Sequence, residues 1–302
     1  MRIEDLRNRL RDLGAKPCHE RRVLRAWTLG KPLDPGPRAA EGWLPLALRR
    51  ALPSLAAEWE GLARVHSRHE SADAAASRLL VALADGQMVE AVLLPRGGLC
   101  VSSQVGCAVG CTFCMTGRTG LARQLGSAEI VAQVAAARRI REVRKVVFMG
   151  MGEPSHNLEA VMEAIEWLGT EGAIGHKNLV FSTVGDRRAF ERLPQGPVKP
   201  ALALSLHSTN AAVRERLLPR APRIDPVELV ERGEAYARAT GYPIQYQWTL
   251  LAGVNDGDEE VEGIARLLAG KHAVMNLIRF NPVEGAGHAR VERHSPPIFA
   301  GF

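Results

Sequence analysis

The first 60 residues place apolar side chains every three to four positions, which is the spacing of amphipathic helices. The pattern predicts helices over Ile3–Leu13, Arg21–Leu29 and Leu44–Leu55. Three prolines break the chain between the last two segments, namely Pro32, Pro35 and Pro37. A small helical N-terminal domain is therefore expected over residues 1–60.

Two strand-like runs follow in the sequence LLVALADGQMVEAVLLP. Asp85-Gly86 joins them, and this dipeptide is preferred in the tight type I′ turns of β-hairpins. The pattern indicates a β-hairpin within a linker over residues 61–95.

From Cys100 onward, apolar runs of strand length alternate with helical periods. After a strand that ends near Ser103, further strands are predicted over Lys145–Gly150, Asn178–Thr183, Ala201–His207, Ile244–Leu251 and Ala273–Phe280. Helices are predicted over Ser127–Arg139 (with Ser127 as N-cap), Leu158–Leu168, Arg187–Leu193, Val227–Thr240 and Glu259–Leu268.

About six βα units in succession predict an α/β fold with a parallel sheet and right-handed crossovers. Residues 96–302 are expected to form this core, as an open sheet or a partial (β/α)6-type barrel. Active sites in such sheets lie at the carboxyl ends of the strands, and the distinctive short motifs of the chain fall there.

The composition is that of an ordinary soluble globular protein, with 46% hydrophobic and 24% charged residues. The N-terminus is charged from its second residue, unlike a signal peptide, and no apolar run approaches the roughly 18 residues that span a bilayer. These features predict a cytoplasmic protein with no membrane contact. Thiols stay reduced there, and clustered cysteines are more often metal-binding or catalytic.

The net charge of +6 favours acidic partners, nucleic acid first among them. Only six of the 39 basic residues are lysines, which leaves 33 arginines. Arginine suits phosphate through its bidentate fork, although a codon preference would give the same composition. The charge is consistent with RNA binding.

Four of the five cysteines lie in CVSSQVGCAVGCTFC. Cys107, Cys111 and Cys114 form C-x3-C-x2-C, so that one loop can wrap three thiolates around a single inorganic centre. A zinc site would need a fourth ligand, for which His207 is a candidate; buried structural thiols are the other alternative. Three cysteines on a 4Fe–4S cluster leave one iron open for chemistry. Cys18 is expected to be a small buried apolar residue.

The cysteine motif, with Phe113 before its third cysteine, resembles the signature of the radical S-adenosylmethionine (SAM) superfamily. That resemblance implies a 4Fe–4S cluster on Cys107, Cys111 and Cys114, whose open iron chelates SAM. The sequence GMGEP follows an apolar strand, as does the superfamily motif that binds the amino group of SAM. It makes Gly152 and Glu153 candidates; the alternative is an ordinary glycine turn.

Over nearly the whole chain, GMGEP, FSTVG, LSLHS and NLIRFNP follow the cysteine motif in the order of the RlmN/Cfr family. The resemblance implies a partial radical SAM barrel with a small N-terminal helical domain. It also implies methyl transfer to carbon 2 or carbon 8 of adenosine in 23S rRNA or tRNA, a monomer, and an electron donor such as flavodoxin. The residues that it places around SAM are Gly152, Glu153, Ser182, Ser205, Leu206, His207 and Asn281. Singly, such residues more often cap or turn the chain.

The same resemblance gives two residues catalytic roles. Glu90 matches the proton acceptor of the family, although on an alternating strand it could equally face solvent. Cys100 matches a thiol that resolves a protein–RNA thioether intermediate by forming a disulfide.

The chain departs from the family pattern near its C-terminus. The family uses a late cysteine, in a motif like DAACGQL, to carry the methyl group, but no cysteine follows Cys114 here. The final residues, RHSPPIFAGF, come soon after Asn281, so a closing strand is also expected to be missing. Three interpretations are a truncated or frameshifted member, a paralogue with SAM cleavage but other chemistry or none, and a non-catalytic RNA-binding relic. We expect that these 302 residues do not methylate RNA.

Overall fold

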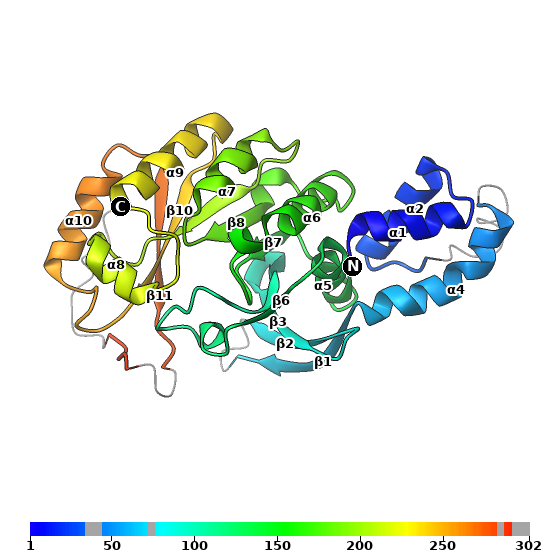
Figure 1. The fold of residues 1–302 in the computed structure, drawn as a ribbon, viewed down its shortest axis with the longest axis horizontal. Helices are drawn as coiled ribbons and strands as arrows, with labels where there is room; N and C mark the ends of the chain where they lie inside the picture. The colour runs from blue at the N-terminus through cyan, green and yellow to red at the C-terminus, as the bar shows by residue number, and fades with distance from the viewer. Residues whose placement is uncertain (34–43, 72–75, 283–286, 292–302) are drawn as a thin grey trace.

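The computed structural model describes residues 1–33, 44–71, 76–282 and 287–291. Helices α1 (Ile3–Asp12), α2 (Pro17–Thr28) and α4 (Leu46–Gly61) form the N-terminal end of the molecule (Figure 1). Each buries its apolar stripe, and the rings of Trp27 and Trp59 meet edge to face with centroids 5.6 Å apart. The three predicted helices are confirmed. Two of the prolines expected to separate them, Pro35 and Pro37, lie outside the described residues.

One sheet of nine strands continues from these helices, in the order β1-β2-β3-β4-β7-β8-β9-β10-β11. Strands β1 to β4 pair antiparallel, and β4 to β11 pair parallel. The bounds are β1 Ala63–Glu70, β2 Ser77–Leu83, β3 Met88–Leu94, β4 Gly98–Val101, β7 Lys145–Phe148, β8 Leu179–Thr183, β9 Ala201–Ser205, β10 Ile244–Leu250 and β11 Ala273–Arg279. The six parallel strands confirm the predicted partial (β/α)6-type barrel.

Helices connect the parallel strands and cover the sheet (Figure 1). They are α5 (Ser127–Arg138), α6 (Leu158–Thr170), α7 (Arg187–Arg192), α8 (Ala211–Leu217), α9 (Pro226–Thr240) and α10 (Asp258–Leu268). Helix α5 is buried along almost its whole length because it packs between the N-terminal helices, α6 and the sheet. Short 3-10 turns precede or follow several elements: η1 Pro95–Gly97, η2 Met115–Gly117, η3 Pro154–Asn157, η4 His176–Asn178 and η5 Leu193–Gln195.

Several local predictions were wrong. The loop between β2 and β3 has three residues, closed by a hydrogen bond from the Leu83 amide to the Gln87 carbonyl, with only Gly86 left-handed. A type I′ turn needs two left-handed residues. Gly126 rather than Ser127 is the N-cap of α5, because the Glu129 carboxylate accepts from the Gly126 amide. Cys18 is exposed at the start of α2, not buried.

Elements β1 and α8 were not predicted. Strand β1 exposes most of its side chains and so lacks an apolar period, and α8 has only seven residues. The predicted domain boundaries at residues 60 and 95 stay predictions. Among the described helices, none combines the length and apolarity needed to cross a membrane.

Candidate functional site

The loop that contains the three cysteines connects β5 (Gln104–Gly106) to β6 (Leu121–Gln124), which pair as a two-stranded ribbon. Gly110 lies in the turn between the first two cysteines with a φ of +68°. A Cβ there would lie 2.4 Å from a terminal nitrogen of Arg220, and one at Gly117 would lie 2.8 Å from the Gly110 Cα. The loop therefore needs both glycines to fold this tightly.

Cys107, Cys111 and Cys114 line one cavity of about 180 Å³. Burial raises the pKa of Cys107 and of Cys111, and the neighbouring thiolates of Cys107 and Cys114 raise that of Cys111 further. Among the described residues, no three His, Cys, Asp or Glu side chains form a closed metal site. The three soft thiols nevertheless share one wall of one cavity, and such donors suit an iron–sulfur centre.

The glycine turn after β7 forms the next wall. Gly152 has a φ of +105°, and a Cβ there would lie 2.6 Å from the Cβ of Gln104. The Glu153 carboxylate is 4% exposed and accepts from the amides of Ser155 and Val184, each at 3.0 Å. Glu153 thereby joins the turn after β7 to the turn after β8.

Sheet register places four predicted side chains on the same face. From β3 to β4, Val92 pairs with Cys100, and Glu90 lies two residues before Val92. Cys100 pairs with Val147 of β7, which pairs with Val180 of β8, two residues before Ser182. Ser182 in turn pairs with Ala203 of β9, two residues before Ser205. Side chains two residues apart on a strand share a face. The face shared by Glu90, Cys100, Ser182 and Ser205 is therefore the one that carries the cavity.

Glu90 and Cys100 lie on this face but do not line the cavity. Glu90 is half-exposed and pairs with Arg78, 2.9 Å from carboxylate oxygen to guanidinium nitrogen. Cys100 is partly buried in β4, and the surrounding protein raises the pKa of its thiol to about 12. Their catalytic roles stay predictions.

His207 has left-handed backbone, with a φ of 58°, and lines the cavity. Its Nδ1 accepts from the Thr249 amide at 3.0 Å, and burial lowers its pKa to about 3, so the ring is neutral. The Asn255 amide nitrogen donates to the carbonyls of His207 and Thr249, at 2.7 and 2.9 Å. Phe113 packs against the histidine edge to face, with ring centroids 4.8 Å apart. One histidine thus joins the cysteine loop to two strand ends.

The other two predicted SAM residues lie differently. The Leu206 side chain is fully buried in the main core and does not line the cavity, and its amide donates to the Gln247 carbonyl at 3.1 Å. Asn281 is exposed after β11, does not line the cavity, and accepts from Arg290 at 3.3 Å.

Sequence reasoning missed Gln247, Thr249 and Arg214. The first two line the cavity and alternate along β10 with the buried Tyr246 and Trp248. This alternation, with a period of two, was the sequence signal that could have identified Gln247 and Thr249. Arg214 lies behind the cavity wall, on a helix that was not predicted.

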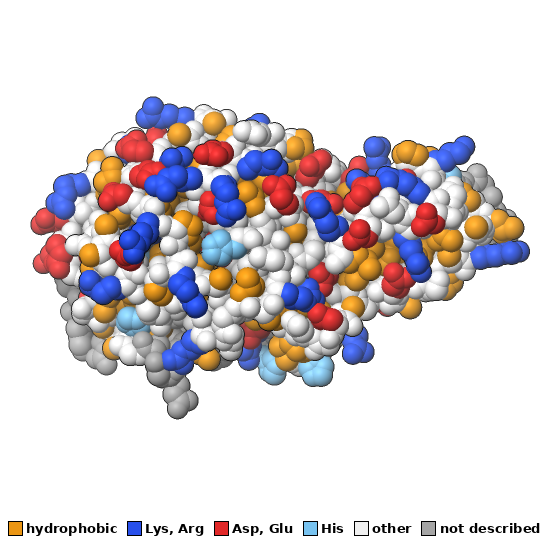
Figure 2. Space-filling view, in the orientation of Figure 1, with side chains coloured by type: hydrophobic (Ala, Val, Ile, Leu, Met, Phe, Trp, Pro, Cys, Tyr) orange, Lys and Arg blue, Asp and Glu red, His pale blue; other side chains and the backbone are white. Residues whose placement is uncertain are grey.

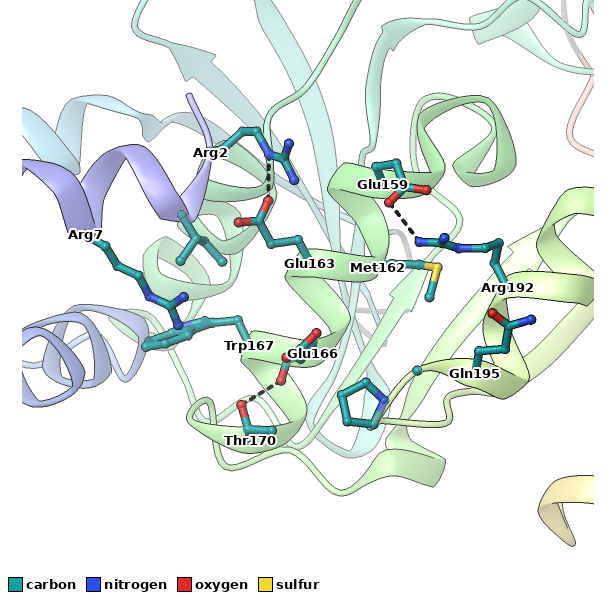
Figure 3. Close-up of a pocket in the computed structure, with 13 residues that line it drawn as sticks. Arg2, Arg7, Glu159, Met162, Glu163, Glu166, Trp167, Thr170, Arg192 and Gln195 are labelled. Carbon is teal, nitrogen blue, oxygen red and sulfur yellow. Dashed lines mark hydrogen bonds and ion pairs between the residues drawn. The ribbon is translucent and has the colours of Figure 1, made fainter. Parts of the chain in front are cut away.

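A larger cavity, of about 530 Å³, lies between α1, α6 and the segment after α7 (Figure 3). Arg2 pairs with Glu163 and Arg192 with Glu159, at 2.8 and 3.0 Å, so four of the six charged side chains that line the cavity pair with one another. No cysteine lines this cavity, and its side chains attach α1 to α6.

Comparison with known proteins identifies the superfamily. The model of the radical SAM superfamily matches residues 101–268, which span the cysteine loop and strands β7 to β10. The chain belongs to the radical SAM superfamily. The cavity that gathers the three cysteines is therefore its expected cofactor site, and the sequence resemblance is confirmed at that level.

Similar proteins agree with this assignment. A probable RNA methyltransferase from Aromatoleum aromaticum is 72% identical over 96% of this chain and 81% of its own. A second, from Chromobacterium violaceum, is 69% identical over 94% of this chain and 81% of its own. The crystal structure of a radical SAM methyltransferase from Sphaerobacter thermophilus has a TM-score of 0.80 at 32% identity, over 97% of this chain and 87% of that one.

Proposed function

We propose that this radical SAM protein acts as an RNA methyltransferase of the RlmN/Cfr type. The reaction would use a 4Fe–4S cluster and SAM to methylate carbon 2 or carbon 8 of adenosine in 23S rRNA or tRNA. The main support is that three thiols, the glycine turn and the ends of β8, β9 and β10 meet in one cavity. Relatives around 70% identical bear the name of probable RNA methyltransferases.

Residues that line the cavity are the candidates for holding the cluster and SAM. Cys107, Cys111 and Cys114 would hold the cluster, which, when bound, supplies the electron that cleaves SAM. Gly152 lets the chain pass close to the ligand. Among the described residues, the hydroxyls of Ser182 and Ser205 have no hydrogen-bond partner, so both are available to the polar groups of SAM.

His207 would position rather than exchange protons. Its Nδ1 is already occupied by the Thr249 amide, and a pKa near 3 keeps the ring neutral at physiological pH. The net charge of +6 favours RNA. A flavodoxin-like electron donor, a monomeric state and a cytoplasmic location remain predictions.

The part of the reaction that the cavity supports is the cleavage of SAM to 5′-deoxyadenosine, because the three cysteines and several of the predicted SAM residues meet there. A second candidate function, RNA binding without SAM turnover, rests on the net charge of +6.

The test is anaerobic reconstitution with iron and sulfide, followed by iron analysis and measurement of 5′-deoxyadenosine after reduction. Cys111→Ala should abolish both signals because the cavity loses one of three ligands. Cys18→Ala is the matched control, since it removes an exposed thiol far along the chain from the loop.

A wild-type chain that binds no iron would contradict the cluster assignment. Iron without 5′-deoxyadenosine would favour the RNA-binding alternative, which crosslinking to rRNA or tRNA then checks. Appearance of 2-methyladenosine or 8-methyladenosine in RNA incubated with the protein, SAM and a reductant would support the proposed methyl transfer and would identify the carbon.

A further inference from the structure

Arg214 is a buried cation without a carboxylate partner. It lies on α8, is 4% exposed, and makes no ion pair with any described acidic residue. A buried charge is costly unless it is paired or well hydrogen-bonded. Such an arrangement calls for a compensating negative charge close by.

The guanidinium donates only to backbone carbonyls. One terminal nitrogen reaches the carbonyl of Val184, just after β8, and that of Ser205, the last residue of β9, the latter at 3.2 Å. The other reaches the Ile224 carbonyl at 3.5 Å, and Nε has no partner among the described residues. Arg214 therefore ties together two strand ends whose side chains line the cofactor cavity.

The acidic groups that interact electrostatically with Arg214 are the Cys111 thiol and the carboxylates of Asp225 and Glu153. Asp225 caps α9 through the Val227 amide, and both Glu153 oxygens accept from backbone amides. Burial lowers the pKa of Arg214 to about 10, so it remains charged at neutral pH. The cysteine loop, once its thiols are ionised by a bound centre, adds a further negative charge to these two carboxylates.

We propose that Arg214 is a positioning residue that places a fixed positive charge behind the cysteine loop and favours the reduced state of the centre bound there. This inference rests on the proposed function, because it requires a cluster on the three cysteines. Reduction by one electron, taken from dithionite or a protein donor, adds one negative charge to that centre. A nearby cation stabilises the added charge by Coulomb attraction.

The test compares three variants of the reconstituted chain. Arg214→Gln removes the charge and keeps an amide donor on a shorter side chain. Arg214→Lys keeps the charge but has a single terminal nitrogen in place of the two of the guanidinium. Arg216→Gln is the matched control, because Arg216 lies on the same helix but is exposed.

The readout is the ratio of reduced to oxidised cluster at one fixed potential, measured by electron paramagnetic resonance. We expect Arg214→Gln to lower this ratio about tenfold, as removal of a partly buried charge predicts. Arg214→Lys and Arg216→Gln should stay within about twofold of wild type. A purely structural role for Arg214 would change stability and iron content without moving this ratio.

The outcomes separate the two proposals. If wild type binds iron and Arg214→Gln gives the same ratio as Arg216→Gln, the charge inference is wrong and the proposed function stands. If Arg214→Gln does not fold, Arg214→Lys decides, since a tenfold fall in a variant that keeps the charge also overturns the inference. A wild-type chain without iron overturns both.

Discussion

The Asn255 side chain hydrogen-bonds the backbone of His207 and Thr249, two residues that line the cavity, and its removal should lower the free energy of unfolding. It is 2% exposed and makes three hydrogen bonds, two to the carbonyls of His207 and Thr249 and one from the Leu251 amide at 2.8 Å. Asn255→Ala loses all three, at about 1 kcal/mol each. Buried backbone groups left unpaired add to this, so the free energy of unfolding should fall by about 3–5 kcal/mol.

The assay is urea unfolding of the iron-free protein, followed by far-ultraviolet circular dichroism. Asn8→Ala is the control, because Asn8 is exposed and accepts only from Arg11, so its loss should cost about 0.5 kcal/mol or less. A fall below about 1 kcal/mol for Asn255→Ala would refute the reasoning. The left-handed turn at His207 would then be held by other contacts.

Gly152→Ala should lower SAM cleavage at least tenfold, because its Cβ would collide with Gln104. Gly253→Ala, also at a positive φ (+67°) but with no neighbour within 4 Å, should retain activity. Ser182→Ala should raise the KM for SAM severalfold with unchanged urea stability, since the hydroxyl has no partner among the described residues. His207 titrates near pH 3 when folded and about 6.5 when unfolded, so the unfolded state takes up the proton first as the pH falls. Between pH 7 and pH 5 wild type should therefore lose about 2 kcal/mol more stability than His207→Gln, and equal losses in urea unfolding would contradict the buried neutral ring.

The order of strands and helices could be predicted because apolar residues recur at regular spacings along the segments of the parallel core. Strands β8 and β9 are apolar on both faces, as expected of strands covered on both sides. The cysteine spacing likewise indicated that three thiols share one loop, and the cavity contains all three.

The rest depends on contacts between distant segments. Asn255 lies in a loop, where nothing marks it as the residue that joins His207 to Thr249 across more than 40 positions. Arg214 resembles any surface arginine of a short helix until the fold buries it. Asp85-Gly86 favours a two-residue turn locally, but in the pairing of β2 with β3 the Leu83 amide bonds the Gln87 carbonyl, so the turn has the three residues 84–86.

Strand β4 is the only described strand with an antiparallel neighbour on one side and a parallel neighbour on the other, β3 and β7. Its four residues consequently fix how the hairpin that carries Glu90 is aligned with the parallel strands that carry Ser182 and Ser205. Inserting a single residue before Cys100 would turn its thiol to the opposite surface and bring an apolar neighbour, Leu99 or Val101, inward. A change in chain length of one residue here would thus change the alignment of Glu90 and Cys100 with the strands that line the cavity.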